Sequence, residues 1–295
     1  MALFDHIASD ALILGSGFTL LSLFISGIVI YSHVRNFVSP SEQKFVIIIV
    51  LMAPVFAINS LLGIFLLDEE SLLGVHVPEW ADSVIDAVKE CYEAVVIWAF
   101  LRLMFSFMKI TDLKSSIPSS LQGKHIHQSF PFSLFMTDIS FDKKNASLLE
   151  RWTLQFVFLR PTLSIMTLIF QLLDVYNNVA IWLPISILLN ISVTLAVYAL
   201  MLFYHAFEKD LSIGKQRPLA KFLSIKGVVF FAFWQGLILQ GLISIGWLKA
   251  GSFFSAVEES TIIQDLLVCI EMGILFSPLQ LYAFSHLDYQ KMKKL

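Results

Sequence analysis

Charged residues are scarce in this sequence: Asp, Glu, Lys and Arg make up only 15% of its 295 residues, against about 25% in an ordinary soluble domain. Glycine (13) and proline (9) are also few, whereas apolar residues reach 57%. Because such a chain could not cover a water-exposed surface, soluble enzymes, nucleic-acid binders and disordered chains are excluded. The two cysteines, Cys91 and Cys269, lie in apolar stretches and indicate neither a disulfide framework nor a zinc site.

Long apolar runs dominate the chain instead. A helix needs about 20 mostly apolar residues to span a bilayer, and seven stretches meet or approach that length. We therefore predict an all-α polytopic membrane protein, in which residues 1–295 form a single transmembrane domain of seven helices. The predicted spans are about 11–34, 44–67, 82–108, 152–173, 179–206, 222–247 and 260–286, with one long connector at 109–151.

The first and third runs need separate arguments. The first is longer than the apolar region of a signal peptide and has no basic stretch before it, so we expect a retained helix. The third opens with a charged stretch between Asp82 and Glu93, but residues 94–108 are nearly uncharged. We count it as a span because the distribution of basic residues requires one there.

Lys and Arg accumulate in the cytoplasmic connectors of membrane proteins. With seven spans, sixteen of the 20 Lys and Arg fall on one side, and only Lys249 falls in a connector on the other. With one span fewer, every later connector would change sides and the basic residues would no longer lie mostly on one side. The sequence thus predicts an outside N-terminus and a cytoplasmic C-terminus. The sequon Asn145-Ala-Ser147 lies in the predicted cytoplasmic connector and is expected to be unglycosylated.

Polar side chains at membrane depth are the candidate functional residues. A charge at the bilayer centre costs about 2.5–3.5 kcal/mol on insertion scales, so such groups are usually paired or functional. We predict one interior substrate-binding layer, with Asp82 and Asp86 in a wetted vestibule nearer the outer surface. The alternative is that each polar group only fastens neighbouring helices. The predicted layer comprises Glu90, Glu93, Arg160, Asn190, Trp234, Gln235 and Glu271.

Catalytic signatures do not accompany these carboxylates. The sequence shows no nucleophile–base pair, metal-ligand spacing or glycine-rich phosphate loop, so we predict no enzyme activity, no catalytic residue, no metal and no cofactor. A G-protein-coupled receptor is disfavoured because the third run ends Leu101-Arg102-Leu103 rather than Asp-Arg-Tyr, and the last run lacks an Asn-Pro-x-x-Tyr segment.

Six dispersed segments resemble the organic solute transporter alpha-subunit / transmembrane protein 184 family. They occur in the family's order, and the resemblance extends over nearly the whole chain. The most distinctive are Asp86-Ala-Val-Lys-Glu-Cys-Tyr-Glu93 in the third run and Gln155-Phe-Val-Phe-Leu-Arg160-Pro161 in the fourth. The other segments are 53–60, 190–198, 221–236 and 269–272.

The resemblance implies a seven-helix protein with an outside N-terminus that carries amphipathic organic solutes, such as organic anions, through an intramembrane polar site. Membrane lipid and that solute are then its expected partners, with no nucleic acid. A single-helix beta subunit and a homo-oligomer both remain open. The connector 109–151 lacks the cysteine-rich patch of the solute-transporter branch. A receptor-like or trafficking protein without translocation is the second hypothesis, in either the plasma membrane or an endomembrane.

Overall fold

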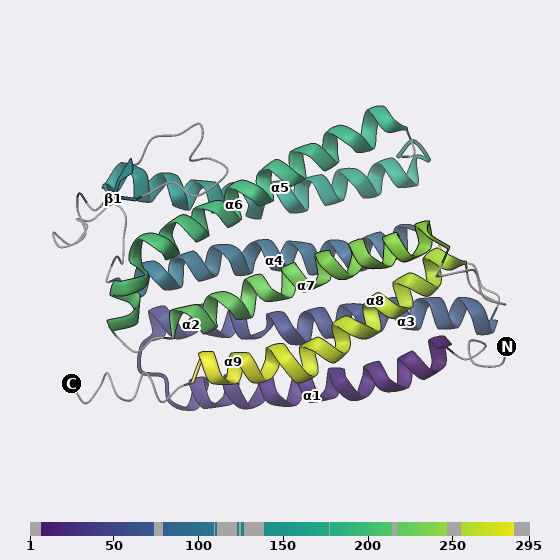
Figure 1. The fold of residues 1–295 in the computed structure, drawn as a ribbon, viewed down its shortest axis with the longest axis horizontal. Coiled ribbons are helices and arrows are strands. Elements are labelled where there is room, and N and C mark those ends of the chain that lie inside the picture. The colour runs from purple at the N-terminus through teal and green to yellow at the C-terminus, as the bar shows by residue number, and fades with distance from the viewer. Residues whose placement is uncertain are drawn as a thin grey trace. The chain divides into compact units, whose positions relative to one another are not determined.

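The computed structural model describes the chain in segments, and helices fill almost all of them (Figure 1). The described residues are 7–73, 79–108, 110, 123, 125–126, 139–176, 178–213, 217–246 and 255–285. The α-helices are α1 (Ile7–Arg35), α2 (Pro40–Val50), α3 (Met52–Leu73), α4 (Glu79–Phe107), α5 (Lys143–Leu172), α6 (Val179–Ile213), α7 (Pro218–Ser244), α8 (Ala256–Glu271) and α9 (Ser277–Ala283).

Five helical segments among the described residues are long and apolar enough to cross a membrane. These segments are Ala8–Arg35, Pro40–Leu67, Lys143–Leu172, Val179–Phe207 and Val257–Ala283. Helices α4 and α7 also occupy predicted runs but are not among the five. The all-α class is therefore confirmed, whereas the number of seven spans and the orientation of the termini stay predictions.

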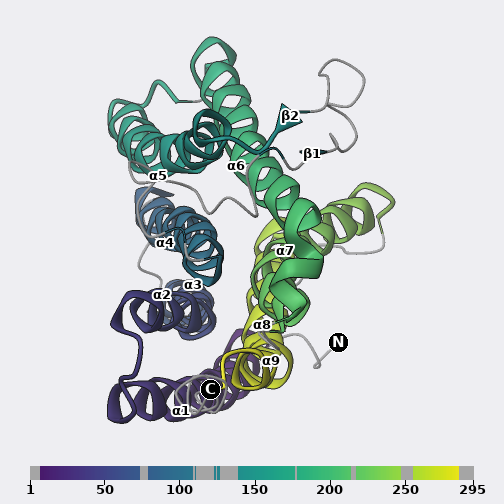
Figure 2. The same ribbon diagram turned by 90° about the vertical axis from the view of Figure 1, so that its left-hand side faces the viewer.

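Helix α5 begins earlier than the hydropathy pattern indicates. It starts at Lys143, inside the predicted connector, because Ala146 and Leu149 already pack into buried positions. A short antiparallel pair, β1 (His125–Ile126) with β2 (Ile139–Ser140), precedes it and lies beside α6 (Figure 2). Most of residues 109–138 of that connector lies outside the described residues.

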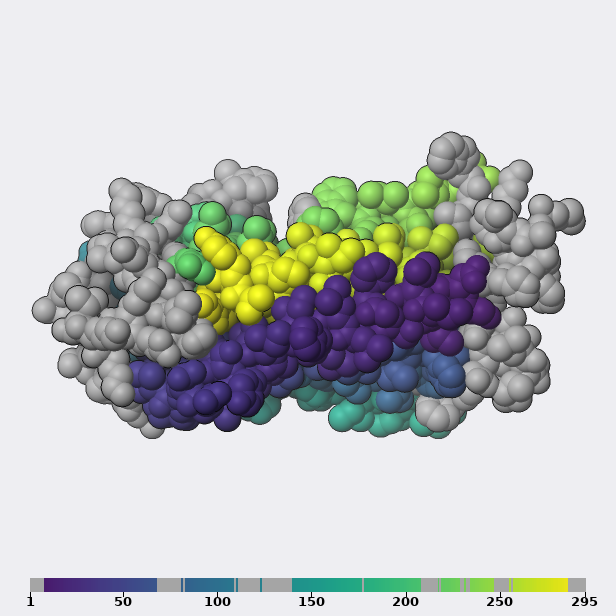
Figure 3. Space-filling view, turned by 90° about the horizontal axis from the view of Figure 1, so that it is seen from below, coloured from purple at the N-terminus to yellow at the C-terminus, as the bar shows by residue number. Residues whose placement is uncertain are grey.

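The chain divides into two compact units, each with its own packing. The first contains residues 1–36, 50–89 and 219–295. In it, α1 runs beside α8 and α9 (Figures 1 and 3), and Ala11 of α1 packs with Ile64 of α3 and Ile262 of α8.

Buried polar contacts also join α1 to the C-terminal helices. Ser22 shares a 2.8 Å hydrogen bond with Ser277, and the His33 ring lies 2.7 Å from the Phe284 carbonyl. Such side-chain bonds replace the hydrophobic driving force that helices lack in lipid.

The second unit contains residues 37–49 and 90–218. Ala94 and Ile97 of α4 pack with Phe156 of α5 and Ala196 of α6 to form its buried core. Helix α2 joins this unit through the Tyr92 hydroxyl, which donates to the Ile48 carbonyl at 2.7 Å. This packing fixes which face of α4 meets α5, and so positions the charged groups described next.

Candidate functional site

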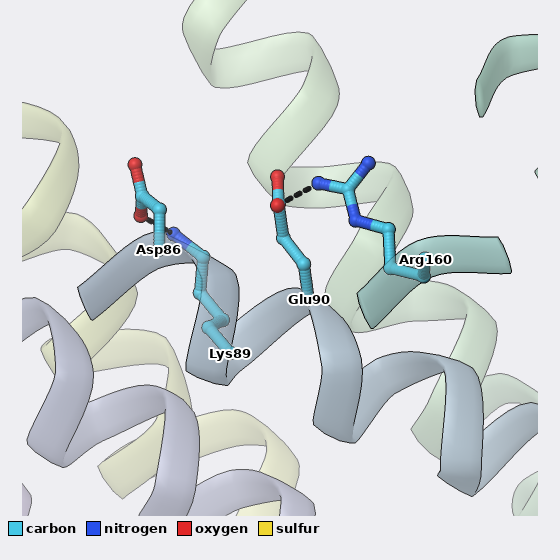
Figure 4. Close-up of polar contacts among 4 residues, drawn as sticks. All are labelled: Asp86, Lys89, Glu90 and Arg160. Atoms are coloured by element: carbon cyan, nitrogen blue, oxygen red, sulfur yellow. Dashed lines mark hydrogen bonds and ion pairs between the residues drawn. The ribbon is translucent and has the colours of Figure 1, made fainter. Parts of the chain in front are cut away.

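An ion pair between Glu90 of α4 and Arg160 of α5 is the central polar contact of the second unit (Figure 4). The Arg160 side chain is 15% exposed and the Glu90 side chain 35% exposed. Arg160 lies 12 residues before the end of α5, which is about 18 Å along a helix. Pairing at that depth offsets the cost of inserting either charge alone.

A second ion pair lies one helical turn earlier on α4. The Lys89 ammonium is 2.6 Å from the Asp86 carboxylate, and the Asp86 side chain is 59% exposed (Figure 4). Residues three or four positions apart on a helix share a face, which explains why the charged stretch of α4 forms ordered pairs. The third candidate of this helix, Glu93, is partly buried.

The first unit holds a separate polar pair, in which the Gln235 amide of α7 donates to the Glu271 carboxylate of α8. Two further acceptors of this pair, Gln235 Oε1 and Glu271 Oε2, are buried without a hydrogen-bond partner among the described residues. An unsatisfied buried acceptor costs about 1–3 kcal/mol. The pair can therefore accept hydrogen bonds from a ligand.

Helical geometry changes directly after Glu271. Residues Met272–Phe276 form the π-helical turn η2, which links α8 to α9. Such turns are rare in proteins, and those that occur are often found at functional sites. The local change re-aims the residues that follow Glu271, and Gly273 in this turn lies against the backbone of Phe18 in α1.

Asn190 and Trp234 are both exposed. The Asn190 side chain is exposed and donates to the Ser186 carbonyl of its own helix at 2.8 Å, and Trp234 is 45% exposed. Glu90 with Arg160, and Gln235 with Glu271, are the predicted residues that the structure brings into contact. Whether these residues form one substrate-binding layer stays a prediction.

Sequence reasoning missed a reciprocal polar contact between α5 and α6. The Ser192 hydroxyl donates to the Gln155 amide oxygen at 2.7 Å, and the Gln155 amide donates to the Ser192 carbonyl at 2.9 Å. Ser192 is two positions from Asn190, and residues two apart point to different sides of a helix. The available sequence signal was Ser192 itself, a polar residue on the face of α6 opposite to that of Asn190.

It also missed residues of a cavity of about 320 Å³ in the first unit, between α3, α4 and α8. Asp86 belongs to the predicted vestibule, but Asp265 and Asn59 were not assigned to it. No sequence signal linked Asp265 to α3. In the structure, a Cβ added to Gly63 of α3 would lie 2.6 Å from the Asp265 carboxylate. The cavity is lined by Asn59, Gly63, Leu67, Ile85, Asp86, Val257, Glu258, Thr261 and Asp265.

These features define a helical integral membrane protein with charged and amide groups buried between its helices. Residues 11–289 match the family described as organic solute transporter Ostalpha, and the chain belongs to this family. That assignment confirms the resemblance found in the sequence and supports an integral membrane protein.

Two curated relatives extend the comparison. A transmembrane protein 184 homolog from Dictyostelium discoideum is 32% identical over 94% of this chain and 52% of its own length. Protein LAZ1 homolog 1 from Arabidopsis thaliana is 29% identical over 94% of this chain and 57% of its own length. The chain thus spans about half the length of these relatives. No solved structure matches it significantly.

Proposed function

We propose that this protein carries amphipathic organic solutes across a membrane by facilitated transport, in which the solute meets the Glu90–Arg160 pair. Family membership supports a solute-transport role. The single observation that carries the proposal is the Glu90–Arg160 ion pair, which joins two helices well inside α5. A pair that only fastened helices would be expected to be fully enclosed, whereas the Glu90 side chain is 35% exposed.

The physical step is an exchange of partners. A buried arginine needs a compensating group because its charge is costly in lipid. The polar head of a solute that reaches Arg160 can replace Glu90 as that group, and the apolar part of the solute stays among aliphatic side chains. The orphaned acceptors of Gln235 and Glu271 can accept hydrogen bonds from hydroxyl or amide groups of such a solute.

Uptake into proteoliposomes tests this role. The full chain is reconstituted, and entry of a radiolabelled steroid sulfate is followed under a concentration gradient. We expect Arg160→Ala and Glu271→Ala each to abolish uptake, because each removes a polar group from the path, with surface expression in cells unchanged. Normal uptake in both variants would refute the assignment.

A double variant separates transport from simple fastening. Removing Arg160 alone leaves the Glu90 charge uncompensated, so loss of uptake in Arg160→Ala does not by itself separate a lost solute contact from a destabilised helix pair. Glu90→Gln combined with Arg160→Gln removes both charges and keeps the amide-sized side chains. We expect this variant to retain the wild-type elution volume in detergent and to lose uptake. Wild-type uptake in the folded double variant would contradict the partner-exchange step.

A receptor-like or trafficking protein without translocation is the second candidate. It is favoured by the names of the two relatives, neither of which states a transport activity. The two candidates differ in one measurement: binding of the steroid sulfate with no flux in the same proteoliposomes would indicate the second. Flux that depends on the protein would indicate the first.

A further inference from the structure

The contact between α7 and α8 leaves two oxygen atoms unsatisfied. The Gln235 amide donates to the Glu271 carboxylate, which joins the two side chains. Among the described residues, the second carboxylate oxygen, Glu271 Oε2, and the amide oxygen, Gln235 Oε1, are buried and have no hydrogen-bond partner. Both atoms are acceptors, so they cannot bond to each other without a hydrogen atom between them. Because burying an acceptor that makes no bond is costly, a donor is expected at this pair.

The charge of Glu271 is not compensated by a cation. Among the residues that the structure describes, the neutral Gln235 amide is its hydrogen-bond partner, and Glu271 makes no ion pair. Glu271 lies inside the apolar segment Val257–Ala283, which is one of the candidate spans. A carboxylate in such surroundings is stable only if it is paired or takes up a proton.

The parts of α1 and α7 that lie near Glu271 contain no ionisable residue. Helix α1 approaches at Gly273, where an added Cβ would meet the α1 backbone, and residues 14–22 of α1 are all uncharged. Helix α7 approaches at Gln235, and residues 231–239 contain no titratable side chain. Within about one helical turn of these contacts, neither helix therefore brings a positive charge to Glu271.

The same is true of α3, and the ionisable groups of α8 itself supply no positive charge. The Cys269 thiol donates to the Ala57 carbonyl of α3 at 3.5 Å, and residues 53–61 of α3 contain no ionisable side chain. On α8, the ionisable residues closest to Glu271 in sequence are Cys269 and Asp265. A thiol is neutral or negative, and a carboxylate repels a second negative charge. A proton is then the simplest positive charge that Glu271 can acquire.

We propose that Glu271 binds a proton and forms a closed acid–amide pair with Gln235. The proton, taken from water, resides on Oε2 of Glu271, and this O–H group donates to Oε1 of Gln235. The amide N–H continues to donate to the other carboxyl oxygen. A carboxylic acid and a primary amide each offer one donor and one acceptor to the other. One proton thus gives both orphaned oxygens a partner and removes an uncompensated charge.

This proton deepens the proposed function, and its consequence for transport rests on that proposal. With Glu271 neutral, its carboxyl group does not repel the anionic head of an amphipathic solute. A solute hydroxyl that donates to either oxygen opens the acid–amide pair and takes the place of the internal bond. Proton binding itself does not depend on translocation, so the two proposals can fail separately.

Infrared difference spectroscopy of the full chain in lipid nanodiscs tests the protonation. Spectra are recorded at about pH 7, where a glutamate with the ordinary pKa of about 4.3 is ionised, and the spectrum of Glu271→Gln is subtracted. This variant keeps an amide-sized side chain that can still bond to Gln235, and its elution volume in detergent verifies the fold. We expect the wild type to contribute the carbonyl band of a protonated carboxylic acid. The bands of an ionised carboxylate in its place would overturn the proposal.

Two further variants identify the hydrogen-bond partner, each measured against the same variant carrying Glu271→Gln. Gln235→Leu removes the amide, so the acid loses its bond and its carbonyl band should shift to higher frequency. Gln240→Leu is the matched control, because Gln240 is an exposed amide of the same helix, and it should leave the band in place. An unshifted band in folded Gln235→Leu would overturn the pairing, as would an equal shift in Gln240→Leu.

The infrared and uptake measurements together separate the two proposals. The acid band without steroid sulfate uptake would refute the transport role and leave the protonated pair standing. Uptake by a protein whose Glu271 is ionised would overturn the protonated pair and leave the transport role standing.

Discussion

Gly273 shows how one absent side chain determines helix packing. It lies in the π turn η2, where an added Cβ would be 2.8 Å from the Phe18 carbonyl oxygen of α1. A backbone atom cannot move aside as a flexible side chain can. Gly273→Ala is therefore expected to separate α1 from η2 and to destabilise the protein by about 1–3 kcal/mol, the usual range for overpacking. Thermal unfolding in detergent measures this loss.

Gly17 provides the matched control for that prediction. It lies in α1, the helix that contains Phe18, and an added Cβ there would meet nothing within 4 Å. Alanine is favoured over glycine inside a helix by about 0.5–1 kcal/mol. Gly17→Ala should thus leave the melting temperature unchanged or raise it. Equal destabilisation by the two substitutions would show that the close approach of α1 to η2 does not determine stability.

At the scale of elements, the contact between α5 and α6 depends on the reciprocal bonds of Gln155 and Ser192. Hydrogen bonds between membrane helices are modest, typically about 0.6 kcal/mol and at most about 1.7. A double-mutant cycle with Gln155→Ala and Ser192→Ala should give a coupling free energy in that range, measured by unfolding in mixed micelles. Additive effects of the two substitutions would mean that the α5–α6 contact depends on apolar packing alone.

Hydropathy gives the position of a helix along the chain but not the face that packs. It identified the runs that became α5 and α6, because lipid requires long apolar segments. The place of Asn190 in the polar layer stays a prediction, whereas the buried contact of Ser192 with Gln155 was not expected from the sequence. In a helix that is apolar all round, the surrounding residues carry little information about orientation.

Pairing across helices was predictable only in part. Glu90 and Arg160 were in the expected set because a lone charge at membrane depth needs a partner. The link between Gly63 and Asp265 was not expected, since it depends on the approach of α3 to α8. Sequence therefore indicates which residues require a partner, and tertiary packing decides which partner each residue receives.

At the scale of the whole molecule, the distribution of basic residues predicts an orientation in the membrane, which the helices alone do not. Five of the described segments qualify as spans by length and hydropathy. An odd total number of spans places the two termini on opposite sides of the membrane, and an even total places them on the same side. Helix α4 is decisive here because its charged pairs lower its hydropathy. Its burial against α5 and α6 through Ala94 and Ile97 supports its inclusion among the spans.

Glycosylation mapping in microsomes tests the odd number of spans and the predicted orientation of the termini. The native sequon at Asn145 is an unsuitable reporter, since the Asn145 amide donates to the Ser140 carbonyl at 2.6 Å and the residue lies in the first turn of α5. A missing glycan at Asn145 would not distinguish this local structure from a cytoplasmic location of the residue. A sequon in a flexible tail appended to either terminus avoids this problem. We expect glycosylation of the N-terminal tail and none of the C-terminal tail, because sixteen of the 20 Lys and Arg favour that orientation. Glycosylation of both tails would require an even number of spans, and the failure would then lie first with α4, whose charges make it the costliest helix to insert.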